Sequence, residues 1–130
     1  LELIPESVHK YPSFWICNSE PSSHPGQHWF TCFFPSQHEP AEFFCSLGRS
    51  PDEYRSDLKD ILSRNGNGTH VWNKVQVQSN TSSACAYYAL YFCDVRCRGL
   101  SYMNCMSILH HRDGATNEKI VTGYVSRHML

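Results

Sequence analysis

The alternation of apolar and polar residues predicts three short strands in the first third of the chain. Residues 11–18, 27–34 and 41–46 are rich in aromatic side chains and are separated by segments that contain Pro and Ser. Because strand side chains alternate between faces, residues 27–34 are expected to present two different faces. One carries His28, Phe30, Cys32 and Phe34, and the other carries Trp29, Thr31 and Phe33. We expect the second and third strands to form a hairpin.

A helix is predicted after the third strand. Ser50 is its expected N-cap, Pro51 its first residue and Glu53 the third, which together make a capping box. One apolar face of this helix follows at helical spacing: Tyr54, Leu58, Ile61 and Leu62. A fourth strand is then predicted from His70 to Gln78, with Val71, Val75 and Val77 on one side.

The last third of the chain is predicted to be helical. Ser82 or Ser83 is expected to cap a helix that runs to about Cys93 and is apolar nearly all round, so we expect it to be centrally buried. Residues 99–104 are expected to break this helix, and residues 117–129 to form a final amphipathic helix. The order of elements predicts an α+β domain.

Composition limits the classes of protein that fit. A chain of 130 residues suits a single domain spanning 1–130, and a net charge of −1 gives no reason to expect binding to nucleic acid or an anionic membrane. The longest apolar stretch, residues 84–93, is too short to cross a bilayer. Seven cysteines, an odd number without a secretory signal, favour free thiols in a reducing compartment. We therefore expect an intracellular, non-secreted protein, and the absence of an initiator Met suggests N-terminal truncation.

Cys85 and Gln78 are the strongest candidates for chemistry. Cys85 lies at the expected start of an apolar helix, where the helix dipole favours a thiolate nucleophile. Gln78, seven residues earlier, can supply an amide donor to an oxyanion. His28 is a candidate general base. The competing interpretation is that Cys85 is a small buried hydrophobe and that His28 is one of eight unremarkable histidines.

A zinc site is the weaker alternative. Its ligands would come from Cys93, Cys97, Cys105, His110 and His111. Zinc clusters usually show tighter paired spacings, so we expect free thiols here, with neither a metal nor another cofactor.

Four segments, 11–18, 25–29, 42–48 and 78–85, resemble the adenovirus-type cysteine endopeptidases, which are related to the ubiquitin-like-protein-specific proteases. The resemblance covers roughly residues 4–110 in the same order. Within the family, the sequence is most similar to the enzymes of virus-like DNA transposons. It implies a central mixed or antiparallel sheet packed on a buried helix that bears the nucleophile. It further implies Cys85 as nucleophile, His28 as base and Gln78 as oxyanion donor beside the Cys85 N–H, with Gln76 a weaker alternative.

The resemblance also implies that Trp29 lines the substrate passage, and it shows three departures. Cys45 occupies the position of the family's orienting acid, although a thiol is a poor hydrogen-bond acceptor. Glu42, three positions before Cys45, is expected to face away. Ala86 replaces the glycine that follows the nucleophile at the substrate site, and the chain starts late relative to the family.

Two hypotheses of function follow. The first is a thiol endopeptidase that cleaves a viral or element-encoded polypeptide precursor after a small residue such as glycine. The resemblance implies an activating peptide or DNA as a partner and a location in the host nucleus, the cytoplasm or the virion. We expect no membrane partner. The second is an inactive relative that binds peptides without cleaving them, suggested by Cys45 and Ala86.

Overall fold

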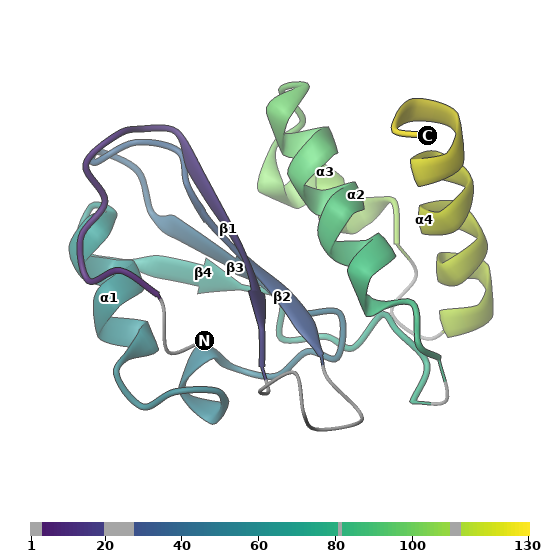
Figure 1. Ribbon diagram of the computed structural model, residues 1–130, viewed down its shortest axis with the longest axis horizontal. Coiled ribbons are helices and arrows are strands. Elements are labelled where there is room, and N and C mark those ends of the chain that lie inside the picture. The colour runs from purple at the N-terminus through teal and green to yellow at the C-terminus, as the bar shows by residue number, and fades with distance from the viewer. Residues whose placement is uncertain (1–3, 20–27, 81, 110–112) are drawn as a thin grey trace.

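The structure, a computed structural model, describes residues 4–19, 28–80, 82–109 and 113–130. A four-stranded sheet lies between α1 (Leu58–Asn65) on one side and α2 (Cys85–Cys97) and α4 (Gly114–His128) on the other (Figure 1). A short helix, α3 (Tyr102–Ser107), connects α2 to the last segment of the chain. The predicted α+β class is confirmed.

The sheet has the strand order β1-β2-β3-β4. Its strands are β1 (Ser13–Asn18), β2 (Trp29–Phe34), β3 (Ala41–Phe44) and β4 (His70–Trp72). Neighbouring strands are antiparallel except for β3 and β4, which are parallel, so the sheet is mixed. The expected pairing of the second and third strands is confirmed, with Cys32 opposite Phe43.

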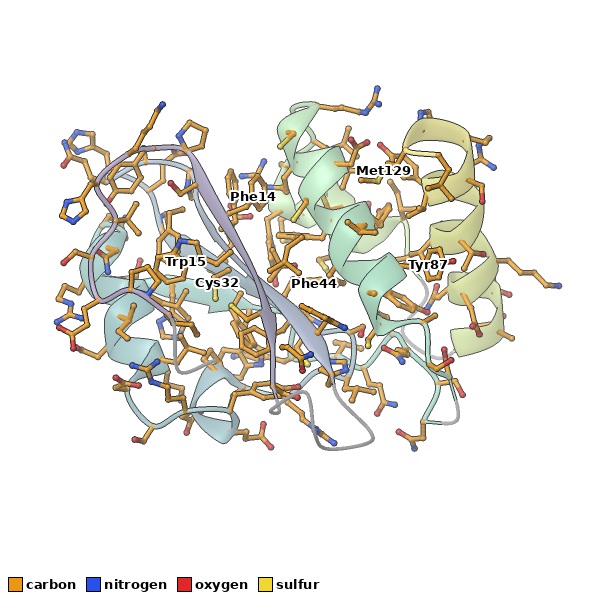
Figure 2. All side chains as sticks on the ribbon, in the orientation of Figure 1. Phe14, Trp15, Cys32, Phe44, Tyr87 and Met129 are labelled. Carbon is orange, nitrogen blue, oxygen red and sulfur yellow. The ribbon has the colours of Figure 1, made fainter. Side chains whose placement is uncertain are left out.

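The two faces of the sheet bury two separate apolar cores. Phe30 and Cys32 pack on the α1 side with Leu58, whereas Phe33 and Phe44 pack on the side of α2. Figure 2 shows Phe44 directed toward α2 and Cys32 on the opposite side of the sheet. This alternation is the one predicted for residues 27–34, and it places His28 at the beginning of the face that looks toward α1.

The prediction of one continuous helix from Ser50 is wrong, because two separate helical elements take its place. A 3₁₀ turn, η1 (Pro51–Glu53), begins with the expected bond from the Ser50 N–H to the Glu53 carboxylate, at 2.6 Å. The chain then leaves the helical path, and α1 begins only at Leu58. Tyr54 consequently lies outside α1, although it packs against the same core as Leu58 and Leu62, with its ring stacked on Phe30 at a centroid distance of 4.6 Å.

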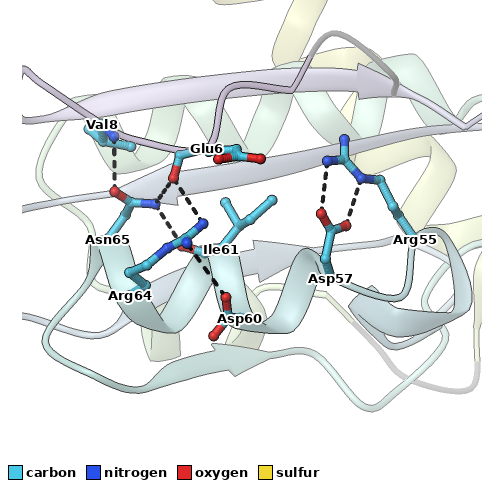
Figure 3. Close-up of polar contacts among 8 residues, drawn as sticks. All are labelled: Glu6, Val8, Arg55, Asp57, Asp60, Ile61, Arg64 and Asn65. Carbon is cyan, nitrogen blue, oxygen red and sulfur yellow. Dashed lines mark hydrogen bonds and ion pairs between the residues drawn. The ribbon is translucent and has the colours of Figure 1, made fainter.

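Polar contacts at both ends of α1 explain how it is placed (Figure 3). Arg55 and Asp57 pair at 2.6 Å across the break that precedes the helix. At the other end, Asn65 accepts a bond from the Val8 N–H at 2.9 Å and donates to the Glu6 carbonyl at 2.9 Å. The segment before β1 is thereby fastened to the end of α1.

The predicted fourth strand is too long. It ends at Trp72 because the buried Asn73 side chain takes over the backbone bonding of the next position, accepting from the Cys45 N–H at 2.9 Å and donating to the Cys45 carbonyl. Val71 and Val75 are exposed and only Val77 reaches a core, so the expected shared side of the three valines is also wrong.

The helical predictions need three corrections. Helix α2 follows Ala84 as N-cap, while Ser82 Oγ accepts from the Ala84 N–H at 3.1 Å. The helix is not buried all round, because Tyr87 is exposed. Within the predicted break, Ser101 caps α3 by accepting from the Asn104 N–H, and α4 begins three residues earlier than expected because Asp113 caps it.

Of the helices in the described ranges, none is long and apolar enough to cross a membrane. All seven cysteines lie within those ranges and are free thiols.

Candidate active site

A cavity of about 290 Å³ opens beside the first residue of α2. Its lining brings together residues from three parts of the chain: His28, Leu47, Arg49, Gln78, Asn80, Ser82, Ser83 and Cys85. Three of the residues predicted to carry chemistry, Cys85, His28 and Gln78, therefore border the same space. The cavity lies where the end of β3, the start of β2 and the N-terminus of α2 converge.

Cys85 occupies the end of α2 that carries partial positive charge. It is the first helical residue and is 7% exposed. The first N–H groups of a helix have no acceptor within the helix, and the N-cap residue here, Ala84, provides no side-chain bond. An anion formed next to Cys85 would therefore meet backbone donors that are still available.

Gln78 is held rigidly at the cavity wall. Its backbone N–H donates to the Ser46 carbonyl at 2.9 Å, and its side-chain carbonyl accepts from the Ser46 hydroxyl. The side-chain Nε2 donates to the Ser82 carbonyl at 2.9 Å. An amide nitrogen has two N–H donors, so one remains for a ligand in the cavity.

Gln76, the weaker alternative, is placed differently. Its Nε2 donates to the Gln78 carbonyl and to Asn80 Oδ1, both at 2.7 Å. Both amide N–H donors are thus used, and Gln76 is not among the residues that line the cavity. The geometry favours Gln78 over Gln76 as an oxyanion donor.

His28 precedes β2 and is 5% exposed. Its backbone is fixed to Ser19, whose N–H donates to the His28 carbonyl at 2.8 Å. Burial lowers the pKa of His28 to about 4, and the positive charge of Arg49 at the cavity wall contributes in the same direction. The imidazole is therefore neutral near pH 7. It can accept a proton, but its surroundings stabilise the resulting imidazolium poorly.

Cys45 is the side chain that faces the ring of His28. The Cys45 sulfur lies 3.3 Å from His28 Nε2, although the two residues are 17 apart along the chain. Cys45 is fully buried, and its backbone is fastened by Asn73. A thiol in this place can accept a bond from Nε2–H, but it stabilises an imidazolium less than a carboxylate would.

Tyr54 completes this group, and the sequence patterns did not indicate it. Its hydroxyl lies 3.1 Å from the Cys45 sulfur, and its ring is nearly parallel to that of His28 at a centroid distance of 6.1 Å. Burial raises the pKa of Tyr54 well above its ordinary value, so the hydroxyl keeps its proton. Helical spacing placed Tyr54 on the apolar face of a helix with Leu58, and no pattern in the sequence marked it as a neighbour of Cys45.

The acidic residues nearby are engaged elsewhere. Glu42 faces the opposite side of the sheet, as expected, where it pairs with Arg96 of α2 at 2.8 Å. Asp52 bonds to the Ser50 hydroxyl, and Glu53 bonds to the Ser50 N–H. In the part of the chain that the structure describes, no carboxylate is hydrogen-bonded to His28.

Two other residues implied by the resemblance lie away from the cavity lining. Trp29 is half-buried on β2, and Ala86 is exposed on the first turn of α2. Their roles in substrate binding stay predictions.

The zinc alternative finds no support in the described residues, among which no three metal-binding side chains gather. Burial raises the pKa of Cys93 to about 12 and that of Cys105 to about 11, which opposes the thiolate form that zinc requires. His110 and His111 lie outside the described residues.

No family model and no curated protein matches this chain. Among solved structures, its fold is similar to that of a protease. That structure is the crystal structure of the selenomethionine ASFV pS273R protease, with a TM-score of 0.54 and 20% sequence identity. The similarity covers 84% of this chain and 42% of the other, so this chain spans less than half the length of that protein. The similarity shows that the two proteins share an α+β fold with a mixed four-stranded sheet flanked by helices.

Proposed function

We propose that this chain is a thiol endopeptidase domain with Cys85 as nucleophile, His28 as base and Gln78 as oxyanion donor. The observation that carries the proposal is that these three side chains line one cavity at the N-terminus of α2. The similarity in fold to a protease supports it independently of the residue types.

The first half of the proposed reaction forms an acyl-enzyme. Because His28 Nε2 faces Cys45, Nδ1 is the ring nitrogen that takes the Cys85 thiol proton. The sulfur then attacks the peptide carbonyl carbon, and the carbonyl electron pair moves onto oxygen. The Cys85 N–H and the remaining Gln78 N–H stabilise this oxyanion. When the carbonyl re-forms, the C–N bond breaks, and His28 gives its proton to the departing amine.

The second half returns the enzyme to its starting state. His28 removes a proton from water, and the resulting hydroxide attacks the thioester carbonyl. The C–S bond breaks, a carboxylic acid is released, and the proton returns from His28 to the Cys85 sulfur. Each step needs an imidazolium intermediate, which the thiol of Cys45 stabilises weakly. We therefore propose a slow enzyme.

The substrate class follows from the family resemblance and not from the cavity. It consists of viral or element-encoded polypeptide precursors cleaved after a small residue such as glycine. An activating peptide or DNA remains a prediction on the same basis.

A second candidate is an inactive relative that binds peptides in the same cavity. Two observations favour it: His28 is bonded to a thiol in place of a carboxylate, and its pKa is about 4. Under this alternative, Cys85 and Gln78 hold a peptide carbonyl without cleaving the chain.

The two candidates are separated by turnover of a peptide library. The endopeptidase predicts new N-termini in the digest, lost in Cys85→Ala and retained in Cys97→Ala, because Cys97 is an exposed thiol outside the cavity. The peptide-binding module predicts retained binding without cleavage, in the parent protein and also in Cys45→Asp.

A further inference from the structure

We propose that Arg49 is a specificity-determining residue that binds a carboxylate of the substrate peptide close to the bond that is cleaved. The inference deepens the proposed function and rests on it, because the peptide must occupy the cavity beside Cys85. It adds an acidic group to the substrate class, alongside the small residue that the family resemblance implies. The peptide-binding candidate would use Arg49 in the same way.

Arg49 gives the cavity a positive charge. Among the described residues that line it, Arg49 is the one cation, and no Asp or Glu is present. His28 is neutral near pH 7, because its pKa is about 4. The N-terminus of α2, which carries partial positive charge, borders the same space. A cleft with charge of one sign attracts ligands of the opposite sign, so an anionic group is favoured here.

The charge of Arg49 is not neutralised within the part of the chain that the structure describes. Arg49 is exposed, and none of the ion pairs among these residues includes it. The acidic residues that follow it closely are engaged elsewhere. Asp52 pairs with Lys59 at 3.3 Å, and Glu53 accepts from the Ser50 N–H at 2.6 Å. A carboxylate from another molecule would therefore meet no competing carboxylate at Arg49.

A contact with Tyr54 holds Arg49 on the side of the cavity where the base lies. The guanidinium, which can only donate, is hydrogen-bonded to the Tyr54 hydroxyl. That hydroxyl lies 3.1 Å from the Cys45 sulfur, which lies 3.3 Å from His28 Nε2. A guanidinium has five N–H donors, so donors remain for both oxygens of a carboxylate.

The size of the cavity limits how far this carboxylate lies from the reacting carbonyl. A volume of about 290 Å³ is at the small end of ligand pockets. Arg49 and Cys85 both line this space, so a group bound to Arg49 belongs to the substrate residues that flank the scissile bond.

A substrate carboxylate at Arg49 would also help the base. The charge of Arg49 is one of the two causes that lower the pKa of His28, and no carboxylate of the described residues is bonded to the ring. A carboxylate paired with the guanidinium offsets that charge, so the imidazolium formed in each half of the reaction is better stabilised. Acidic peptides should therefore show a higher kcat as well as tighter binding.

The binding test uses the Cys85→Ala protein, so that no peptide is consumed. Fluorescence anisotropy compares short labelled peptides with a central glycine, each with Glu or its neutral isostere Gln at one neighbouring position. We expect about two- to fivefold tighter binding of a Glu peptide, the strength of a partly exposed ion pair, and a smaller preference at high salt. Amidated and free C-termini are compared as well, because a terminal carboxylate has the same chemistry as a Glu side chain.

Two substitutions assign the preference to Arg49. Arg49→Gln should abolish it, and Arg49→Glu should reverse it in favour of a peptide with Lys at the same position. A reversal is a gained preference, which a misfolded protein would not show. Arg127→Gln is the matched control, because Arg127 is an exposed arginine on α4 that does not line the cavity. It should keep the preference of the parent.

Cleavage of the same peptides by the protein with Cys85 intact separates this inference from the proposed function. Arg49-dependent binding without cleavage would refute the endopeptidase and leave the role of Arg49 standing. Cleavage with equal kcat/KM for the Glu, Gln and free C-terminal peptides would overturn the inference and leave the endopeptidase standing. Equal Kd values for these peptides, a preference retained in Arg49→Gln, or no binding of any peptide would also overturn it.

Discussion

His28 Nε2 lies 3.3 Å from the sulfur of Cys45, so the base of this candidate site is oriented by a thiol. This contact has two consequences. The imidazole has a defined partner, which fixes the direction of its ring. No formal negative charge lies on the thiol beside the imidazole, and burial keeps the pKa of His28 at about 4.

Replacement of the thiol by a carboxylate should strengthen the base. Cys45→Asp is expected to raise the pKa of His28 and to increase kcat/KM about tenfold or more, because an orienting acid contributes on the order of 10⁴ in a serine protease. NMR titration of His28 and peptide turnover measure the two effects. Cys45→Ser is the matched control, since serine is similar in size to cysteine and uncharged. This variant should show neither a raised pKa of His28 nor an increase in kcat/KM. A carboxylate variant with no gain in turnover would favour the peptide-binding candidate.

The low pKa of His28 also makes stability depend on pH. In the folded protein the group titrates near 4, against an ordinary value of 6.5. Between these values the unfolded chain binds more protons, so the free energy of unfolding should fall as pH drops from 6.5 toward 4. The loss is expected to be about 1–2 kcal/mol, less than the full shift allows because the ring borders an open cavity.

Urea unfolding of the parent and of His28→Asn across this range measures that contribution as a difference. Subtraction is needed because His70 also has a lowered pKa through burial. An identical slope in both proteins would show that His28 is not a buried neutral group.

Gly48 should be needed for the position of Gln78. Its φ is +73°, and a Cβ there would lie 2.8 Å from the backbone nitrogen of Gln76, two residues before Gln78. Left-handed strain alone should lower the free energy of unfolding of Gly48→Ala by about 1–2 kcal/mol, and the clash with Gln76 should lower it further. The variant should also have a lower kcat, because the segment that carries the oxyanion donor must shift.

Gly68→Ala is the control for this prediction. Its φ is +96°, but a Cβ there meets nothing within 4 Å. It should lose stability from strain and keep its turnover. Equal kinetics in the two alanine variants would contradict the proposed role of Gln78.

Much of the fold follows from local sequence signals. Alternation along residues 27–34 predicted both faces of β2, and a cysteine at the start of an apolar run predicted that α2 begins near Cys85, within one or two residues of the observed start. Gln78 and His28 were candidates from their positions in the sequence, and the family resemblance added support, since neither residue type is distinctive by itself.

The errors arose where a tertiary contact overrides a local pattern. The Asn73 side chain replaces the backbone bonds of a longer β4, and the helix is interrupted between η1 and α1, where Tyr54 stacks on Phe30. Neither partner is near in sequence, so periodicity alone contained no sign of them. Tyr54 was missed as part of the site for this reason.

The most direct test of the central claim is covalent labelling with a peptide vinyl sulfone ending in glycine, with the modified residue mapped by mass spectrometry. If Cys85 is a nucleophile served by His28, the label should fall on Cys85, disappear in Cys85→Ala and form at least about tenfold more slowly in His28→Ala. Labelling of the exposed Cys97 in preference to Cys85, or an unchanged rate in His28→Ala, would contradict it.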